Sequence, residues 1–265
     1  MNVFIFELKA LLKSSIGWCI SMLCLSFVYF SIYSSLADDM IHFKNLLEGY
    51  PESVRALLGV SLDTITSVLG YYSMILTFVV LCGAIQGMIY GTSILSKEYR
   101  EKTSDFLLVK PMKRTSIVTS KILAGLTMLV VTWLLYYIGV SFHINVVKTT
   151  DYSNKLFFMM NLTLLLLQIT FFAIGLIVSI LLPRLKSVLP ISLGIVFGLY
   201  IMGAVLAQDK DDILRFISPF RFVNYTDLLY SSQYEVQYVI AAFIIIVLSI
   251  ITTYSIYAKR DIHAA

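Results

Sequence analysis

The chain has 265 residues, of which 58% are hydrophobic and 14% are charged, and its formal net charge is +4. Soluble domains carry about 25% charged residues, so this composition excludes an ordinary soluble protein and indicates a chain that lies in a membrane. The basic residues flank apolar runs instead of clustering on one polar segment, which argues against nucleic acid as a partner.

Six apolar runs are long enough to cross a bilayer, because about 20 helical residues span a hydrocarbon core of roughly 30 Å. These predicted spans are residues 16–36, 71–95, 116–140, 156–182, 187–207 and 236–258. They take up more than half of the chain and leave no room for a separate soluble domain. We therefore expect an all-α polytopic membrane protein in which residues 1–265 form a single transmembrane domain.

Residues 2–13 precede the first span and predict an amphipathic helix on the cytoplasmic surface of the membrane. Apolar side chains recur there at helical spacing, with polar ones opposite: Phe4, Ile5, Leu8, Leu11 and Leu12 against Asn2, Lys9 and Lys13. The alternative is a plain helical extension of the first span. Ser35-Leu36-Ala37 resembles a signal-peptide cleavage site, but the apolar run before it exceeds the usual 7–15 residues, so we keep this segment as a span.

Lys and Arg are distributed unequally between the two sides of these spans. With the N-terminus inside, the inner segments hold 13 of the 20 basic residues, namely Lys9, Lys13, Lys97, Arg100, Lys102, Lys110, Lys113, Arg114, Lys121, Arg184, Lys186, Lys259 and Arg260. An excess of Lys and Arg marks cytoplasmic loops. We therefore expect both termini in the cytoplasm. The outer loops 38–69 and 208–235 carry helical apolar patterns, interrupted by Pro51 and Pro219, and predict short interfacial helices that cap the outer mouth.

Glycines form helical stripes in two spans. Gly83, Gly87 and Gly91 share one face of the second span, and Gly194 and Gly198 share one face of the fifth. Small residues let helices approach closely in lipid, where apolar side chains alone give little reason to associate. The stripes predict either packing within one subunit, or a subunit interface or moving contact.

Uncharged amides lie deep in two spans, at Gln86, Asn161 and Gln168. They predict interhelical hydrogen bonds, with contact to a substrate as the alternative. The middle of each span lacks Asp, Glu, Lys and Arg, which argues against a proton- or sodium-coupled carrier.

The segment between the second and third spans, residues 96–114, is strongly charged and has to lie in water. Residues 98–108 predict a short surface helix, which Pro111 ends because proline disfavours a helical residue before it. Apolar side chains alternate there with charges of both signs, as Tyr99, Phe106 and Leu107 among Glu98, Arg100, Glu101, Lys102 and Asp105. This mixture suits a protein groove; the alternative is a solvated positive-inside loop.

Catalytic and metal-binding motifs are missing from the sequence. The three histidines make no paired pattern, the three cysteines lack metal or disulfide spacing, and no G-x-x-x-x-G-K-[ST] loop is present to bind ATP phosphates. We therefore expect no enzyme, no cofactor and no metal in this chain itself.

The pattern Glu98-x4-Thr103-x3-Leu107-Leu108-x2-Pro111-x2-Arg114-x6-Lys121 resembles the signature of ABC-2 type permeases, the membrane subunits of ATP-driven exporters. Further likenesses are Tyr50-Pro51-Glu52, Leu57-Leu58-Gly59 and Ser218-Pro219-Phe220. Lys102 departs from the family, which often has glycine there. The small six-span form without a fused ATPase is similar to bacterial exporters of antimicrobial peptides and amphipathic toxins, including the phenol-soluble modulin exporters.

The resemblance implies a bacterial cytoplasmic membrane protein that works as a dimer, with a homodimer expected, together with two copies of a cytosolic ABC ATPase that bind ATP and Mg. It makes residues 98–108 the coupling helix in an ATPase cleft and residues 2–13 the elbow helix. The implied coupling residues are Glu98, Arg100, Glu101, Thr103, Phe106, Leu107, Pro111 and Arg114. Arg114 and Lys121 would anchor this lever to lipid headgroups or the ATPase, or serve as plain flank charges.

The implied activity is export of a hydrophobic or amphipathic substrate, with a peptide as one candidate. The second and fifth spans, with Gln86 and the glycine faces, are the expected lining of the pathway. An intramembrane enzyme would need a catalytic His or acid within the spans, and the sequence has none there. A membrane receptor or assembly factor needs no special chemistry and stays as the alternative.

Overall fold

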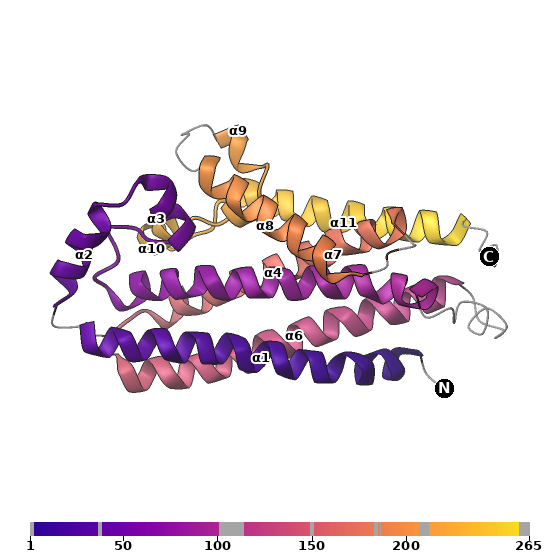
Figure 1. Ribbon diagram of the computed structural model, residues 1–265, viewed down its shortest axis with the longest axis horizontal. Helices are drawn as coiled ribbons and strands as arrows, with labels where there is room; N and C mark the ends of the chain where they lie inside the picture. Colours follow the sequence, from indigo (N-terminus) through magenta and orange to yellow (C-terminus); the bar gives the residue numbers. More distant parts are fainter. Residues whose placement is uncertain are drawn as a thin grey trace.

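The computed structural model describes residues 3–36, 39–100, 114–148, 151–182, 185, 187–206 and 212–259. Within these ranges every regular element is helical (Figure 1). The elements are α1 (Val3–Leu36), α2 (Met40–Glu48), α3 (Glu52–Leu58), α4 (Val68–Arg100), α6 (Arg114–Val147), α7 (Asn154–Leu181), α8 (Leu189–Val205), α9 (Asp212–Arg215), the 3₁₀ helix η3 (Pro219–Arg221), α10 (Tyr225–Ser231) and α11 (Val236–Lys259).

Five of the described helices are long and apolar enough to cross a membrane: α1, α4, α6, α7 and α11. They correspond to five of the six predicted spans, and the all-helical polytopic architecture is confirmed. The remaining predicted span is α8, which is apolar but has 17 residues. At 1.5 Å per residue its length is about 26 Å, slightly less than a hydrocarbon core of roughly 30 Å.

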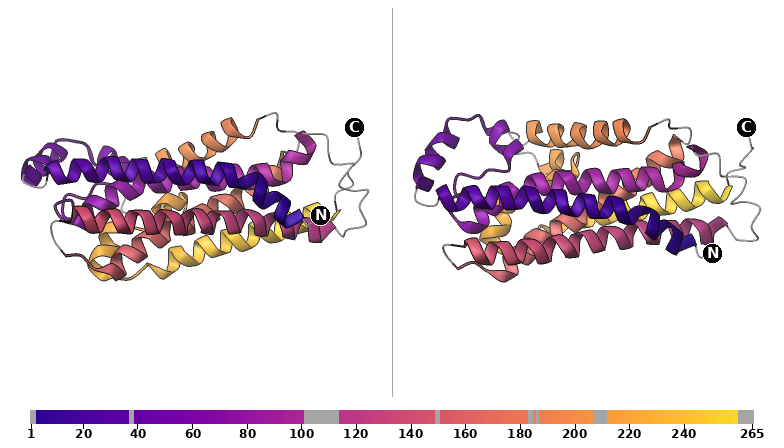
Figure 2. Two further views of the ribbon diagram at one scale, coloured as in Figure 1. Left: turned by 90° about the horizontal axis from the view of Figure 1, so that it is seen from below. Right: turned by 60° about the horizontal axis from the view of Figure 1, so that its bottom comes forward.

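The chain from Val3 to Leu36 forms one continuous helix, so the predicted helix over residues 2–13 is not a separate element. A helical extension of the first span was the alternative interpretation of these residues. No proline interrupts the helix, and its polar residues are accommodated individually: Glu7 and Ser15 are buried, whereas Lys9 and Lys13 are exposed. The N-terminal part of α1 bends relative to the rest, as both views in Figure 2 show.

The long helices run side by side along the longest axis of the molecule, with α4 at the centre (Figures 1 and 2). α4 packs most extensively against α7, α1 packs against α6, and α11 packs against α7. Most of α4 is buried, whereas α1 and α11 expose many apolar side chains, including Val28, Ile32, Phe243 and Val247. Such faces suit contact with lipid tails, which are as apolar as the side chains.

The short helices α2, α3 and α10 gather at one end of the bundle (Figure 1). The opposite end holds the beginning of α1 and the end of α11. The structure thus agrees with the prediction that residues 38–69 and 208–235 form short helices. Pro51 immediately precedes α3, and Pro219 is the first residue of η3, so both prolines stand at helix boundaries.

Candidate functional site

The predicted coupling residues lie at the junction between α4 and α6. Glu98 and Arg100 belong to the last turn of α4, and Arg114 is the first residue of α6. Glu101, Thr103, Phe106, Leu107 and Pro111 lie outside the described residues. The segment therefore joins two packed helices at the end of the bundle where α1 begins and α11 ends (Figure 1).

A buried ion pair lies close to this junction. The Nζ of Lys121, on α6, donates to Oε1 of Glu7, on α1, over 2.9 Å and to the backbone O of Ile94, on α4, over 2.8 Å. Lys121 is 0% exposed and Glu7 is 5% exposed. A buried charge is costly unless it is paired and hydrogen-bonded, so these contacts hold three helices together at one point.

Two further contacts link α1 to α4 at the same end. The hydroxyls of Ser15 and Tyr90 are 2.8 Å apart and both residues are buried. The Nζ of Lys97 lies 5.7 Å from the ring centroid of Phe6, within the range of a cation–π interaction. Phe6, in the predicted elbow segment, and Ser15, just after it, thus contact the helix that leads into the predicted coupling segment.

A chain of amide hydrogen bonds crosses the middle of the bundle. Gln168 Nε2, on α7, donates to Gln86 Oε1 over 3.0 Å, and Gln86 Nε2 donates to Thr132 Oγ1, on α6, over 3.1 Å. Thr132 in turn donates to the backbone O of Met128 over 2.7 Å. Gln86 therefore links α4 to α6 and α7, through the kind of interhelical hydrogen bond that the sequence predicts for this amide.

The glycines of α4 lie directly against α7. A Cβ atom on Gly87 would come within 2.2 Å of the Gln168 backbone O, and one on Gly91 within 2.1 Å of the Phe172 backbone O. A Cβ on Gly83 would lie 2.4 Å from a methyl group of Leu164. No side chain fits at these distances, so the stripe on α4 serves close packing between two helices of one chain.

The glycines of α8 have a different environment. A Cβ atom on Gly194 or Gly198 would meet nothing within 4 Å. Both glycines are exposed on a face that also presents Phe197, Ile201 and Val205. The buried side of α8 packs against α4, α3 and η3. The structure thus separates two stripes that look alike in the sequence.

Aromatic hydroxyls form a second polar cluster between the central helices. Tyr72 donates to Asn161 Oδ1 over 2.7 Å, and its hydroxyl lies 3.3 Å from that of Tyr136. Tyr136 is in turn 2.9 Å from the hydroxyl of Ser26, and Trp133 Nε1 donates to the backbone O of Asn161 over 2.9 Å. This cluster joins α1, α4, α6 and α7.

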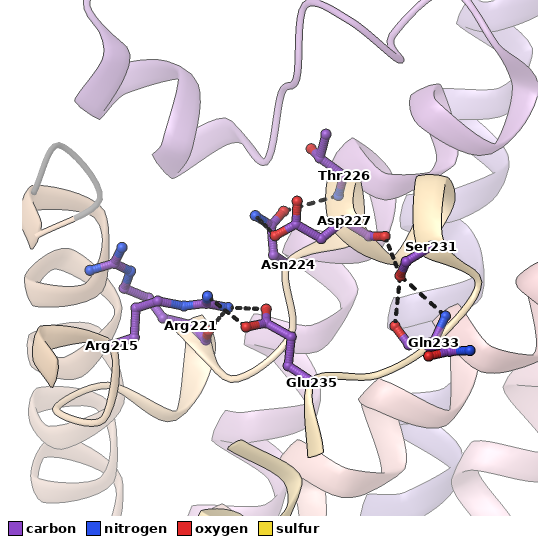
Figure 3. Close-up of polar contacts among 8 residues, drawn as sticks. All are labelled: Arg215, Arg221, Asn224, Thr226, Asp227, Ser231, Gln233 and Glu235. Carbon is purple, nitrogen blue, oxygen red and sulfur yellow. Dashed lines mark hydrogen bonds and ion pairs between the residues drawn. The ribbon is translucent and has the colours of Figure 1, made fainter. Parts of the chain in front are cut away.

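The end that carries the short helices encloses a cavity of about 270 Å³ between α3, α4, α8 and the η3–α10 region. Arg215, one of its lining residues, bonds Glu235 over 2.6 and 3.0 Å (Figure 3). Its guanidinium also lies 4.1 Å from the ring centroid of Tyr238. Arg221 donates over 2.6 Å to the O of Leu206, at the C-terminal end of α8. The cavity wall is therefore fixed by ion pairing and helix capping.

Two tyrosines near this cavity attach the short helices to α7. Tyr234 donates to the backbone O of Met159, and the Tyr225 hydroxyl lies 3.1 Å from that of Thr163. Burial raises the pKa of both tyrosine hydroxyls well above the ordinary value. They therefore remain neutral hydrogen-bonding groups at physiological pH.

Sequence reasoning missed the pairing of Glu7 with Lys121, although both residues carried a signal. Lys121 is the charged residue within the predicted span 116–140, and Glu7 is the acidic residue among the apolar positions of 2–13. A charge within an apolar run needs a partner. The sequence could not name that partner, because 114 positions separate the two residues.

These features define a class: a polytopic helical membrane protein held together by polar contacts between its spans. In the part of the chain that the structure describes, no three His, Cys, Asp or Glu side chains gather as a metal site would require. The model of the ABC-2 family transporter proteins matches residues 1–262, so the chain belongs to this family. Neither the curated proteins nor the solved structures gave a match.

Family membership settles the general role of the chain. It is a membrane permease component of an ABC-2 transporter and, because members of this family lack ATPase domains, it is not itself the ATP-hydrolysing enzyme. ABC-2 permeases generally work with an ATPase subunit. The chain is therefore a multi-pass membrane protein of a family without ATPase domains.

Proposed function

We propose that this chain is the membrane subunit of an exporter that moves a hydrophobic or amphipathic substrate, with a peptide as the candidate, out of a bacterial cell. Two cytosolic ABC ATPase subunits supply the energy from ATP and Mg. The observation that carries the proposal is the position of residues 98–114 between α4 and α6, at the end of the bundle that also holds the beginning of α1 and the end of α11.

The proposed topology has six spans with both termini in the cytoplasm. α7 ends at the same end as the beginning of α1, whereas α9 and α10 lie toward the other end, so α8 has to cover the length between them (Figure 1). Its 17 residues suffice if the bilayer thins slightly or flanking residues reach the interface. The excess of basic residues at the end with 98–114 favours the cytoplasm there.

The proposed coupling element is the segment that follows α4. In our account, Phe106 and Leu107 insert into an apolar groove of the ATPase, and the charges of Glu98, Arg100 and Glu101 orient the contact. Thr103, Pro111 and Arg114 complete the set: they shape the segment that connects the coupling helix to α6. Closure of the two ATPases on ATP then displaces the adjoining ends of α4 and α6.

A second copy of the chain is the proposed partner in the membrane. The exposed face of α8 with Gly194, Phe197, Gly198 and Ile201 supports this assignment, because glycines allow close helix approach in lipid and none of the described residues covers these two glycines. Gln86 is internal to one subunit. We place the pathway along the exposed face of α8, between the two copies, because the described side chains of α4 are buried or half-buried.

The test is copurification with a candidate ABC ATPase subunit from the same organism. The intact pair should elute together in detergent with ATPase activity, and Leu107→Asp should abolish the association, because a carboxylate in an apolar groove lacks a partner. Leu46→Asp is the matched control: Leu46 is 71% exposed on α2 at the opposite end. If the intact chain failed to bind any ATPase, a receptor or assembly factor would replace the exporter.

A further inference from the structure

The pair Glu7–Lys121 joins the beginning of α1 to the end of α4 and the beginning of α6, the two helix ends that flank the 98–114 segment in the chain. We propose that this pair is a positioning joint, which makes the beginning of α1, the end of α4 and the beginning of α6 move as one body. Displacement of the 98–114 segment is thereby passed to α1. The source of this displacement rests on the proposed function, whereas the joint itself rests on the contacts of this chain.

The joint lies at a matched distance from the segment on both sides. Ile94 is six residues before the end of α4 at Arg100, and Lys121 is seven residues after the start of α6 at Arg114. Six or seven residues are about two helical turns. A push on the segment therefore reaches the ammonium group of Lys121 through two short, regular helix ends.

The contacts specify a position and not only an attraction. Lys121 donates in two directions, to a carboxylate of α1 at 2.9 Å and to a main-chain carbonyl of α4 at 2.8 Å. Apolar surfaces can slide over one another, but hydrogen bonds weaken steeply when their distance or angle changes. Fixing the register between elements is the best-attested use of buried polar groups.

Burial makes the joint all-or-none. Lys121 is 0% exposed and Glu7 is 5% exposed. If the ion pair separated at this depth, water could not replace the lost contact, and the separation would therefore be costly. The neighbouring positions Ile117, Val118 and Ile122 of α6 are buried apolar residues. The three helix ends therefore either shift together or separate completely.

Neighbouring contacts extend the rigid body. The Ser15–Tyr90 hydrogen bond of 2.8 Å joins α1 to α4 two turns further along α1. The hydroxyls of Thr119, on α6, and Tyr254, on α11, are 2.7 Å apart. The joint thus stands among contacts that reach four of the five long helices at this end of the bundle.

Three variants separate positioning from simple stability. Lys121→Met removes the ammonium group that Glu7 contacts at 2.9 Å, and Glu7→Leu removes that carboxylate contact from the buried Lys121, so each should lower the unfolding midpoint by roughly 10 °C. The double variant Glu7→Leu/Lys121→Met leaves no charge and should regain most of the loss. Lys13→Met, at an exposed position of α1, is the control and should match the wild type.

The decisive readout is amide hydrogen exchange of the full chain in complex with its ATPase, with and without ATP. In the wild type, ATP should change exchange in residues 3–14 as well as 114–122. In the double variant the change at 114–122 should remain, whereas that at 3–14 should be lost. If the double variant passes the change to residues 3–14 as the wild type does, the pair has only a structural role and the proposal is wrong.

Failure of the proposed function would be recognised separately, since the wild type would then bind no ATPase. The joint is tested in that case on the chain alone. The double variant should exchange faster than both the wild type and Lys13→Met over residues 3–14, while α10 at the other end stays unchanged. Equal exchange in all three proteins would overturn the joint.

Discussion

Gly59 shows how a single residue positions the end of the bundle that carries the short helices. It ends α3 with a φ of 66°, in the left-handed region; its backbone N–H donates to the carbonyl of Ala56, and the next N–H, of Val60, donates to the carbonyl of Arg55. A Cβ atom here would lie 2.0 Å from Oγ1 of Thr77 on α4. Both the conformation and the contact therefore require glycine.

Gly59→Ala should destabilise the protein by roughly 1–3 kcal/mol, because the substitution combines a strained φ with a steric overlap. The measurement is the thermal unfolding midpoint of the full chain in detergent. Gly49→Ala is the control: Gly49 has a φ of −70°, and a Cβ there would make an ordinary 3.5 Å contact. Equal midpoints for the two variants would contradict the strained geometry at Gly59.

At the scale of elements, the pairing of α4 with α7 dominates the bundle. Three glycines of α4 bring its backbone against α7, and the Gln86–Gln168 hydrogen bond of 3.0 Å lies in the same contact. In lipid, packing and interhelical hydrogen bonds take over the role that apolar burial has in water. The pair therefore forms the fixed centre around which α1, α6, α8 and α11 are arranged.

Gly91→Ala should cost roughly 1–3 kcal/mol of stability through overpacking. The new methyl group would lie 2.1 Å from the Phe172 carbonyl oxygen, which is backbone and cannot rotate away. Gly194→Ala is chemically the same change on α8, where the Cβ meets nothing within 4 Å, and should leave the subunit's own unfolding midpoint unchanged. A loss at Gly194 as large as at Gly91 would show that α8 is packed differently.

Sequence patterns predicted the positions of the helices better than the contacts between them. Apolar runs located five of the long helices, but α4 extends to Arg100 and α6 to Val147, beyond the predicted ends at 95 and 140. Charged and polar residues at span ends are helical too, and a hydrophobicity pattern does not register them. Lys97, for example, lies in the last part of α4, and its ammonium group makes a cation–π contact with the ring of Phe6.

Contacts between residues far apart in the chain could not be predicted from a single sequence. The amide of Asn161 had an expected interhelical partner, yet nothing in the sequence indicated Tyr72, which is 89 positions away. The glycine stripes on α4 and α8 likewise gave the same pattern, and only the arrangement of helices separates the packed stripe from the exposed one. Such distinctions depend on which faces meet, a property of the whole bundle.

At the scale of the whole molecule, the proposed coupling junction and the short helices lie at opposite ends of the bundle. The 98–114 junction, the beginning of α1 and the Glu7–Lys121 pair lie at one end, whereas the short helices and the 270 Å³ cavity lie at the other. The long helices connect the two ends without a break of their own. A displacement at one end can therefore reach the other through rigid elements.

The most direct test of the central claim is the mass of the complex that the chain forms with its ATPase in a detergent or nanodisc of known mass. Our account predicts two copies of this 30.0 kDa chain together with two ATPase subunits. The same particle should lose both ATPases, but keep two permease chains, when Leu107 is replaced by Asp. A chain that elutes alone beside a free ATPase would contradict the account.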